Sequence, residues 1–141
     1  MRIALEPSWL ILNFREPQQT LSWAVQGGGF QTAQNVVWHQ IKNQDLPQDR
    51  DPHLFLLEKL KAKGLSPAIA MLTSAELSRY QDVSKELEGL AVRSIGTVGM
   101  TNALRVGDTA SLNAAGTINL LCAVSRPLSQ PALVEALSIA V

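Results

Sequence analysis

The segment from Asp51 to Leu72 constrains the fold most strongly, because it reads as a helix followed directly by a buried strand. Asp51-Pro52 is typical of a helix start, with Asp as the N-cap and Pro at the first helical position. Lysines crowd the last turn, and Gly64 ends the helix. Pro67 to Leu72 is a continuous apolar run of strand length, which is typical of a strand buried on both faces. Together these two elements favour an α/β fold.

The first 40 residues read as strands joined by turns. Trp9 to Phe14 and Thr20 to Val25 are short β-prone runs, separated by a polar turn that contains Pro17. Gly27-Gly28-Gly29 then breaks the chain, and Asn35 to Ile41 resumes as a further strand. This half of the chain is therefore hairpin-like.

The second half alternates helices with strands. Thr73-Ser74-Ala75-Glu76 has capping-box spacing and predicts a second helix that runs through Val83. Leu90 to Met100 and Thr117 to Val124 are predicted strands, and a third helix begins at Ser129. We expect a single α/β domain with a mixed β-sheet and about three packed helices.

Composition limits the classes of partner. The chain has 141 residues, which suits one domain, and its 12 basic and 12 acidic residues cancel. No basic face is implied, so we expect no nucleic-acid partner. No apolar run reaches the roughly 20 residues that span a bilayer, and Glu6 and Pro7 interrupt the apolar N-terminus. We expect a soluble, cytoplasmic protein without a membrane partner, in which the lone Cys122 fills the core.

The end of the chain is apolar to its last residue. The predicted third helix reaches Val141 without a glycine, a basic turn or a polar tail. This pattern predicts a chain cut inside a structural element. An apolar helix face left open in this way favours contact with a second copy or domain exchange, so a homo-oligomer is the expected partner.

The sequence lacks the motifs that identify several enzyme classes. There is no nucleophile elbow, phosphate loop, His-Glu-x-x-His or paired-cysteine spacing, and no ligand cluster implies a metal. His39 and His53 lack ligand-like spacing and are predicted to be structural. The residues alone favour a flexible turn for Gly27-Gly28-Gly29, although its N–H groups could also approach a ligand.

Two asparagines sit just inside Gly/Thr-rich strand ends. Asn102 and Asn119 either face a ligand as an amide pair or tie loops together, and the residues favour neither. Thr73 reads as a helix cap that could also present its hydroxyl in a site. Trp9, Trp23 and Trp38 are expected to pack in the core, with a flat apolar wall for a ligand as the alternative.

Five short motifs and the last fourteen residues carry a resemblance that covers nearly the whole chain. The motifs are Leu21-Ser22-Trp23-Ala24, Trp38 with Asn43-x-Asp45-Leu46-Pro47, Met71-Leu72-Thr73-Ser74, Thr97-Val98-Gly99-Met100-Thr101-Asn102-Ala103 and Gly116-Thr117-Ile118-Asn119. In this order they resemble the adenosylcobinamide amidohydrolase family. The resemblance implies hydrolysis of the amide that joins the aminopropanol arm to the corrin of adenosylcobinamide. The products are adenosylcobyric acid, which re-enters cobalamin assembly, and aminopropanol.

This reaction needs a base, a nucleophile and donors for the oxyanion. We expect the base to be one of two carboxylates near motif residues, Asp45 or Asp108. Asn102, Asn119 and the N–H groups of Gly27-Gly28-Gly29 are expected to stabilise the oxyanion. The hydroxyl nucleophile is expected to be Thr73, with Thr101 or Ser22 as alternatives. The predicted substrate-binding residues are Ser22, Trp23, Gly28, Gly29, Asn43, Thr101 and Thr117. The corrinoid is the substrate, and neither a cofactor nor a metal is implied.

The chain departs from the family pattern in three places. Position 39 is His where the family usually has Arg, and position 101 is Thr where Ser is common. Family members also extend beyond the last helix into a Gly/Thr-rich segment with an Asp. The resemblance therefore implies that residues 1–141 form a shortened domain. The alternative to an amidohydrolase is a corrinoid-binding module without turnover.

Overall fold

The structure is a computed structural model, and it describes residues 1–47, 49–100, 105–109 and 116–140. Its strands are β1 (Arg2–Glu6), β2 (Trp9–Ser22), β3 (Gly29–Gln40), β4 (Ile69–Thr73), β5 (Gln81–Leu87), β6 (Leu90–Gly99) and β7 (Thr117–Val124). Its helices are α1 (Pro52–Lys63) and α2 (Gln130–Ala140), with short 3₁₀ turns at η1 (Asn43–Asp45) and η2 (Leu77–Arg79).

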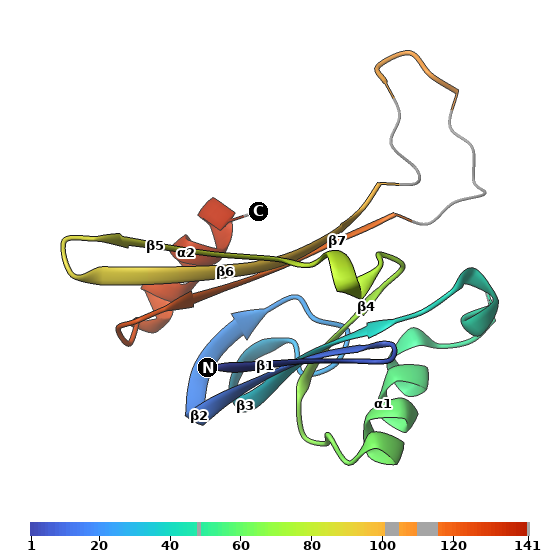
Figure 1. Cartoon of the computed structure of the whole chain (residues 1–141), viewed down its shortest axis with the longest axis horizontal. Coiled ribbons are helices and arrows are strands. Elements are labelled where there is room, and N and C mark those ends of the chain that lie inside the picture. The colour runs from blue at the N-terminus through green and yellow to red at the C-terminus, as the bar shows by residue number, and fades with distance from the viewer. Residues whose placement is uncertain (48, 101–104, 110–115, 141) are drawn as a thin grey trace.

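Two stacked sheets form the body of the fold (Figure 1). The first has the order β1-β2-β3-β4, in which β1, β2 and β3 are antiparallel and β4 runs parallel to β3. The second has the order β5-β6-β7 and is wholly antiparallel. The predicted α/β class and mixed sheet are confirmed. The prediction of one sheet is wrong, because the second half of the chain builds a sheet of its own.

Helix α1 forms where its capping residues predict it. The Asp51 carboxylate accepts hydrogen bonds from the backbone N–H groups of His53 at 2.7 Å and Leu54 at 3.2 Å. Gly64 ends the helix in the left-handed conformation, with φ of 71°. The helix is the crossover between the parallel strands β3 and β4. Its buried Leu56 and Leu60 pack on one face of the first sheet.

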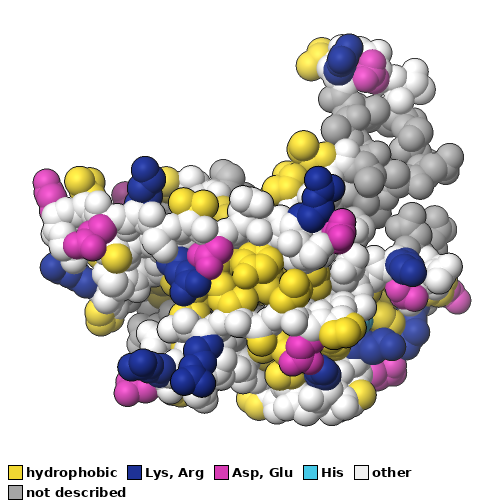
Figure 2. Space-filling view, in the orientation of Figure 1, with side chains coloured by type: hydrophobic (Ala, Val, Ile, Leu, Met, Phe, Trp, Pro, Cys, Tyr) yellow, Lys and Arg dark blue, Asp and Glu magenta, His cyan; other side chains and the backbone are white. Residues whose placement is uncertain are grey.

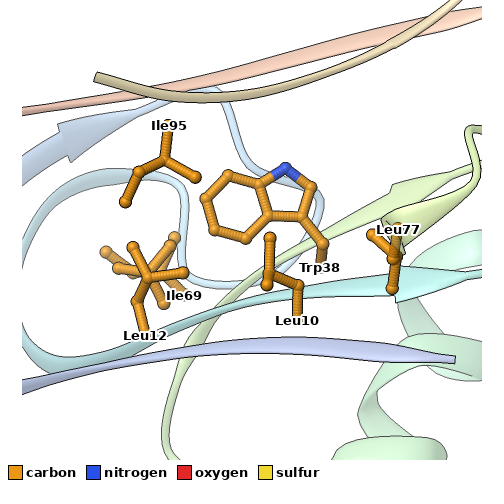
Figure 3. Packing of buried hydrophobic residues seen from close by; sticks show 7 residues of the cluster. Leu10, Leu12, Trp38, Ile69, Leu77 and Ile95 are labelled. Carbon is orange, nitrogen blue, oxygen red and sulfur yellow. The ribbon is translucent and has the colours of Figure 1, made fainter. Parts of the chain in front are cut away.

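The other face of the first sheet packs against the second sheet. Trp38 on β3 is completely buried there, beside Leu10 and Leu12 of β2 (Figure 3). Ile95 covers them from β6, and Leu77 closes the cluster from η2. Figure 2 shows apolar side chains along the seam between the two sheets. This inter-sheet core holds the two halves of the chain together.

The predicted break in the first hairpin is wrong. Trp9 to Ser22 is one continuous strand, and the polar residues around Pro17 form an irregularity in its pairing with β3, between Asn13 and Gln18. Proline is tolerated within a sheet at such bulges, since the ladder hydrogen bond that it cannot donate is already interrupted there. A polar stretch with proline therefore marks a bulge here and not a turn.

The predicted helix after Thr73 is also wrong. Its place is taken by the short turn η2 and by strand β5, so the described residues contain two α-helices and not about three. Strand β5 pairs with β6 through a hairpin turn at Glu88 and Gly89, both with positive φ, of 51° and 75°. Long-range pairing thus overrides a local capping signal.

Side-chain burial corrects two further predictions. Cys122 is exposed, not in the core, because it lies on the outer face of strand β7, 3.4 Å from the Ser94 hydroxyl. Trp9 and Trp38 are buried as expected, whereas Trp23 is 72% exposed. The third predicted helix is confirmed as α2. Within the residues that the structure describes, no helix is long and apolar enough to cross a membrane.

Candidate functional site

Several predicted site residues meet where the parallel strands β3 and β4 end. Gln40 pairs with Thr73 in the register of the two strands, and the N–H of Ile41 donates to the Thr73 carbonyl at 2.9 Å. Sites in α/β folds form outside the carboxyl ends of parallel strands, where side chains leave the sheet. Strand β7 begins at the same place, because Thr117 contacts the residues that follow β4.

Three hydroxyl residues form the hydroxyl cluster, which consists of Thr73, Ser74 and Thr117. The Thr73 and Thr117 hydroxyl oxygens lie 2.9 Å apart, and Thr117 Oγ1 accepts from the Ser74 N–H at 3.1 Å. Thr73 Oγ1 also accepts from the Ala75 N–H at 3.0 Å. Thr73 is completely buried. These bonds fix the chain after β4 against the start of β7.

Asn119 joins the same two strands. Its Nδ2 donates to the Leu72 carbonyl at 2.8 Å, across the interface between the sheets. This is the tying role that the sequence offered as one of two alternatives. Asn102, its predicted companion, and Thr101 lie outside the described residues.

An open hollow of about 500 Å³ lies beside the hydroxyl cluster. It is lined by Ser74, Ala75, Glu76, Arg79, Gln81, Gly96, Val98, Gly99 and Met100. A Cβ on Gly99 would lie 3.3 Å from the Ala75 nitrogen and Cβ, so glycine allows the chain after β4 to approach β6 this closely. The hollow combines exposed apolar side chains, Val98 and Met100, with charged ones.

Glu76 and Arg79 line the hollow, but neither belongs to one of the five motifs of the sequence. The capping-box spacing places Glu76 in a predicted helix that does not form, so the sequence gives no reason to expect Glu76 in a site. One feature of the sequence does point to Glu76: it lies two residues after the Met71–Ser74 motif.

Asp45 lies just beyond the end of β3, on the exposed turn η1 that Asn43 begins. Its carboxylate accepts from the Lys42 N–H at 2.7 Å, so it caps the turn. Asp108 is engaged in a similar way with the N–H of Arg105, at 2.8 Å. Across the described residues, no group of three or more His, Cys, Asp or Glu could hold a metal ion.

The remaining predicted binding residues lie at the tip of the β2–β3 hairpin. Ser22 pairs with Gly29, and exposed Trp23 follows. The turn folds back so that Gln26 exchanges two backbone hydrogen bonds with Ala70, near the start of β4. The hydroxyl cluster lies at the other end of that strand. The predicted site residues therefore lie in two groups, one at the hydroxyl cluster and one at the tip of the β2–β3 hairpin.

Gly28 provides a test of how tightly this turn is packed. A Cβ at this position would lie 2.8 Å from the Ala24 carbonyl oxygen, so Gly28→Ala must displace backbone. We expect it to lower the free energy of unfolding by about 1–2 kcal/mol, measured by thermal unfolding. Gly29→Ala is the matched control, because its Cβ meets no atom within 4 Å and only its φ of +81° adds strain. A Gly28→Ala protein that is as stable as the unchanged protein would contradict this packing.

His39 lies in the fold as a structural residue, as the sequence predicted. Its ring stacks on Trp9 with centroids 4.1 Å apart. Nδ1 lies 3.0 Å from the Ser8 carbonyl oxygen and must carry a proton, because a carbonyl only accepts. Burial lowers the pKa of His39 and Lys59 lowers it further, while Ser8 and Asp45 act in the opposite direction.

The lowered pKa of His39 predicts a loss of stability in mild acid. The unfolded chain binds a proton at His39 with a pKa of about 6.5, above that of the folded protein. The contribution of His39 to the free energy of unfolding is therefore fully present above about pH 6.5. It is lost as the pH falls from there towards the pKa of His39 in the folded protein. In urea unfolding at about pH 7.5 and about pH 5, His39→Phe should show a smaller difference than the unchanged protein. An equal difference in both proteins would assign the acid sensitivity to other groups.

Comparison with known proteins gives one match. The family model described as adenosylcobinamide amidohydrolase matches residues 1–141, the whole chain. Searches of curated proteins and of solved structures find no match. A match over the full length agrees with the five motifs and with their order along the chain. The chain belongs to the adenosylcobinamide amidohydrolase family.

Proposed function

We propose that this protein hydrolyses the amide between the aminopropanol arm and the corrin of adenosylcobinamide. Water adds to the amide carbon, the C–N bond breaks, and adenosylcobyric acid and aminopropanol leave. The observation that carries the proposal is the family match over the whole chain. The meeting of three motifs at one edge of the fold supports it, since Thr73-Ser74, Val98-Gly99-Met100 and Thr117 to Asn119 surround the hollow or its hydroxyl cluster.

The hollow and its surroundings suit this chemistry. Amide hydrolysis requires a group that takes a proton from water and donors for the oxyanion. In this proposal Thr73 and Asn119 are positioning residues, because their polar groups bond to the strands that they hold. Asn102 remains the proposed oxyanion donor. Asp45, which the sequence predicts as the base, is one of two candidate bases, and its carboxylate already accepts from the Lys42 N–H. The hairpin tip, with Ser22, Trp23, Gly28 and Gly29, is the proposed contact for outlying parts of the corrinoid, and Asn43, Thr101 and Thr117 remain proposed contacts near the reacting amide.

The test is direct product detection. The purified chain is incubated with adenosylcobinamide, and adenosylcobyric acid and aminopropanol are followed by mass spectrometry. Heat-denatured protein is the control for spontaneous hydrolysis. Both products in equal amounts support the proposal, whereas unchanged substrate at saturating protein contradicts it.

A corrinoid-binding module without turnover is the second candidate. The burial of Thr73, the predicted nucleophile, favours this candidate. Its hydroxyl is completely buried and hydrogen-bonded to Thr117 and to the Ala75 N–H, so it is not free to attack a substrate. This candidate predicts a change in the corrinoid absorption spectrum on addition of protein, without release of aminopropanol.

A further inference from the structure

Glu76 and Arg79 are the charged residues that line the hollow. The Thr73 hydroxyl beside it is completely buried, so it cannot meet the amide of a bulky substrate without rearrangement. The Glu76 carboxylate, in contrast, belongs to an exposed residue at the wall of the hollow.

The backbone around Glu76 is held on both sides. Before it, the N–H groups of Ser74 and Ala75 donate to the hydroxyl cluster at 3.1 and 3.0 Å. After it, Leu77 is buried in the inter-sheet core. The carboxylate itself accepts a hydrogen bond from the Ser78 hydroxyl at 2.7 Å. The backbone contacts and the Ser78 hydroxyl therefore restrain the position of the Glu76 carboxylate at the wall of the hollow.

Arg79 follows Glu76 by one turn of 3₁₀ helix. Its N–H donates to the Glu76 carbonyl at 3.1 Å, and side chains three residues apart lie above one another in this helix. The hollow therefore offers a carboxylate and a guanidinium on the same wall. A guanidinium suits the negative charge that develops on an amide oxygen under attack.

We propose that Glu76 is the general base of the amide hydrolysis, an inference that rests on the proposed function. The Glu76 carboxylate takes a proton from water while the water oxygen bonds to the amide carbon. The carboxylic acid formed on Glu76 then returns the proton to the amine nitrogen as the C–N bond breaks. One water is consumed, and Glu76 is regenerated.

The experiment compares the full chain with Glu76→Gln and with Glu86→Gln. Glu86 is an exposed glutamate on β5 that does not line the hollow, so it is the matched control. Glu76→Gln should lower kcat by about 10²–10⁴-fold, with KM changed little, and Glu76→Asp should recover part of the loss.

The outcomes separate this inference from the proposed function. An unchanged chain that releases no product overturns both. An active chain with an equally active Glu76→Gln variant overturns the inference alone. Loss of rate in Asp45→Asn but not in Glu76→Gln would also overturn it, and would assign the base to Asp45.

Discussion

Replacing Trp38 with alanine is expected to lower the free energy of unfolding by about 3–5 kcal/mol. Trp38 is completely buried between the two sheets, where it contacts the cluster of Leu10, Leu12 and Ile95. Removing the indole leaves a cavity in the apolar core between the two sheets. Urea unfolding followed by circular dichroism measures the loss.

Two variants test the reason for this loss. Trp23→Ala removes the same side chain from a 72% exposed position and should change stability by less than about 0.5 kcal/mol. Trp38→Phe should cost only about 1–2 kcal/mol, because the Trp38 Nε1 has no hydrogen-bond partner to lose. A Trp38→Ala protein as stable as Trp23→Ala would show that the sheets do not pack through this residue.

Thr117→Val should impair both stability and hydrolysis, because it removes the hydroxyl that Thr73 and Ser74 share. The variant keeps the shape of the side chain but leaves the Ser74 N–H without the oxygen 3.1 Å away. We expect a loss of about 2–3 kcal/mol in unfolding free energy. Because the chain after β4 carries the wall of the hollow, we also expect kcat/KM to fall by about 10²-fold.

Thr117→Ser is the control for this prediction. It retains the oxygen and should keep most of the stability and rate. If Thr117→Val hydrolyses adenosylcobinamide as fast as Thr117→Ser, the hydroxyl cluster does not position the hollow.

Helix α1 and strand β4 could be predicted from the sequence because residues within or next to each element determine its structure. Helix α1 was predicted because Asp51 supplies the cap that its N–H groups require and Gly64 supplies the left-handed end. Strand β4 was predicted because it lies between a helix and a second sheet, and so is apolar on both faces. In both cases short-range chemistry and tertiary structure agree.

The elements that were missed depend on distant partners. Strand β5 is exposed along its whole length, so hydrophobic periodicity cannot reveal it, and only its pairing with β6 defines it. The same capping-like residues, Thr73 to Glu76, therefore suggested a helix. Cys122 was misplaced for a related reason, because an apolar run does not tell which of its residues point outwards.

The candidate site was predictable only where local motifs mark its residues. The family motifs identified Thr73, Thr117 and Asn119, which the fold brings together from β4 and β7. They did not identify Glu76, whose proximity to Gly99 and Met100 exists only after the two sheets stack. The grouping of Ser22 and Gly29 at the hairpin tip likewise depends on strand register, which no local pattern encodes.

The exposure of Cys122 has a practical consequence. It is the single cysteine of the chain, so a maleimide dye would attach at one defined position without any substitution. That position is three residues along β7 from Asn119, about 10 Å at the rise of a strand. Corrinoids absorb visible light, so under the proposed function a dye on Cys122 should lose emission by energy transfer when adenosylcobinamide is bound. Cys122 is therefore a natural attachment point for a fluorescent test of the proposed corrinoid binding that does not depend on turnover.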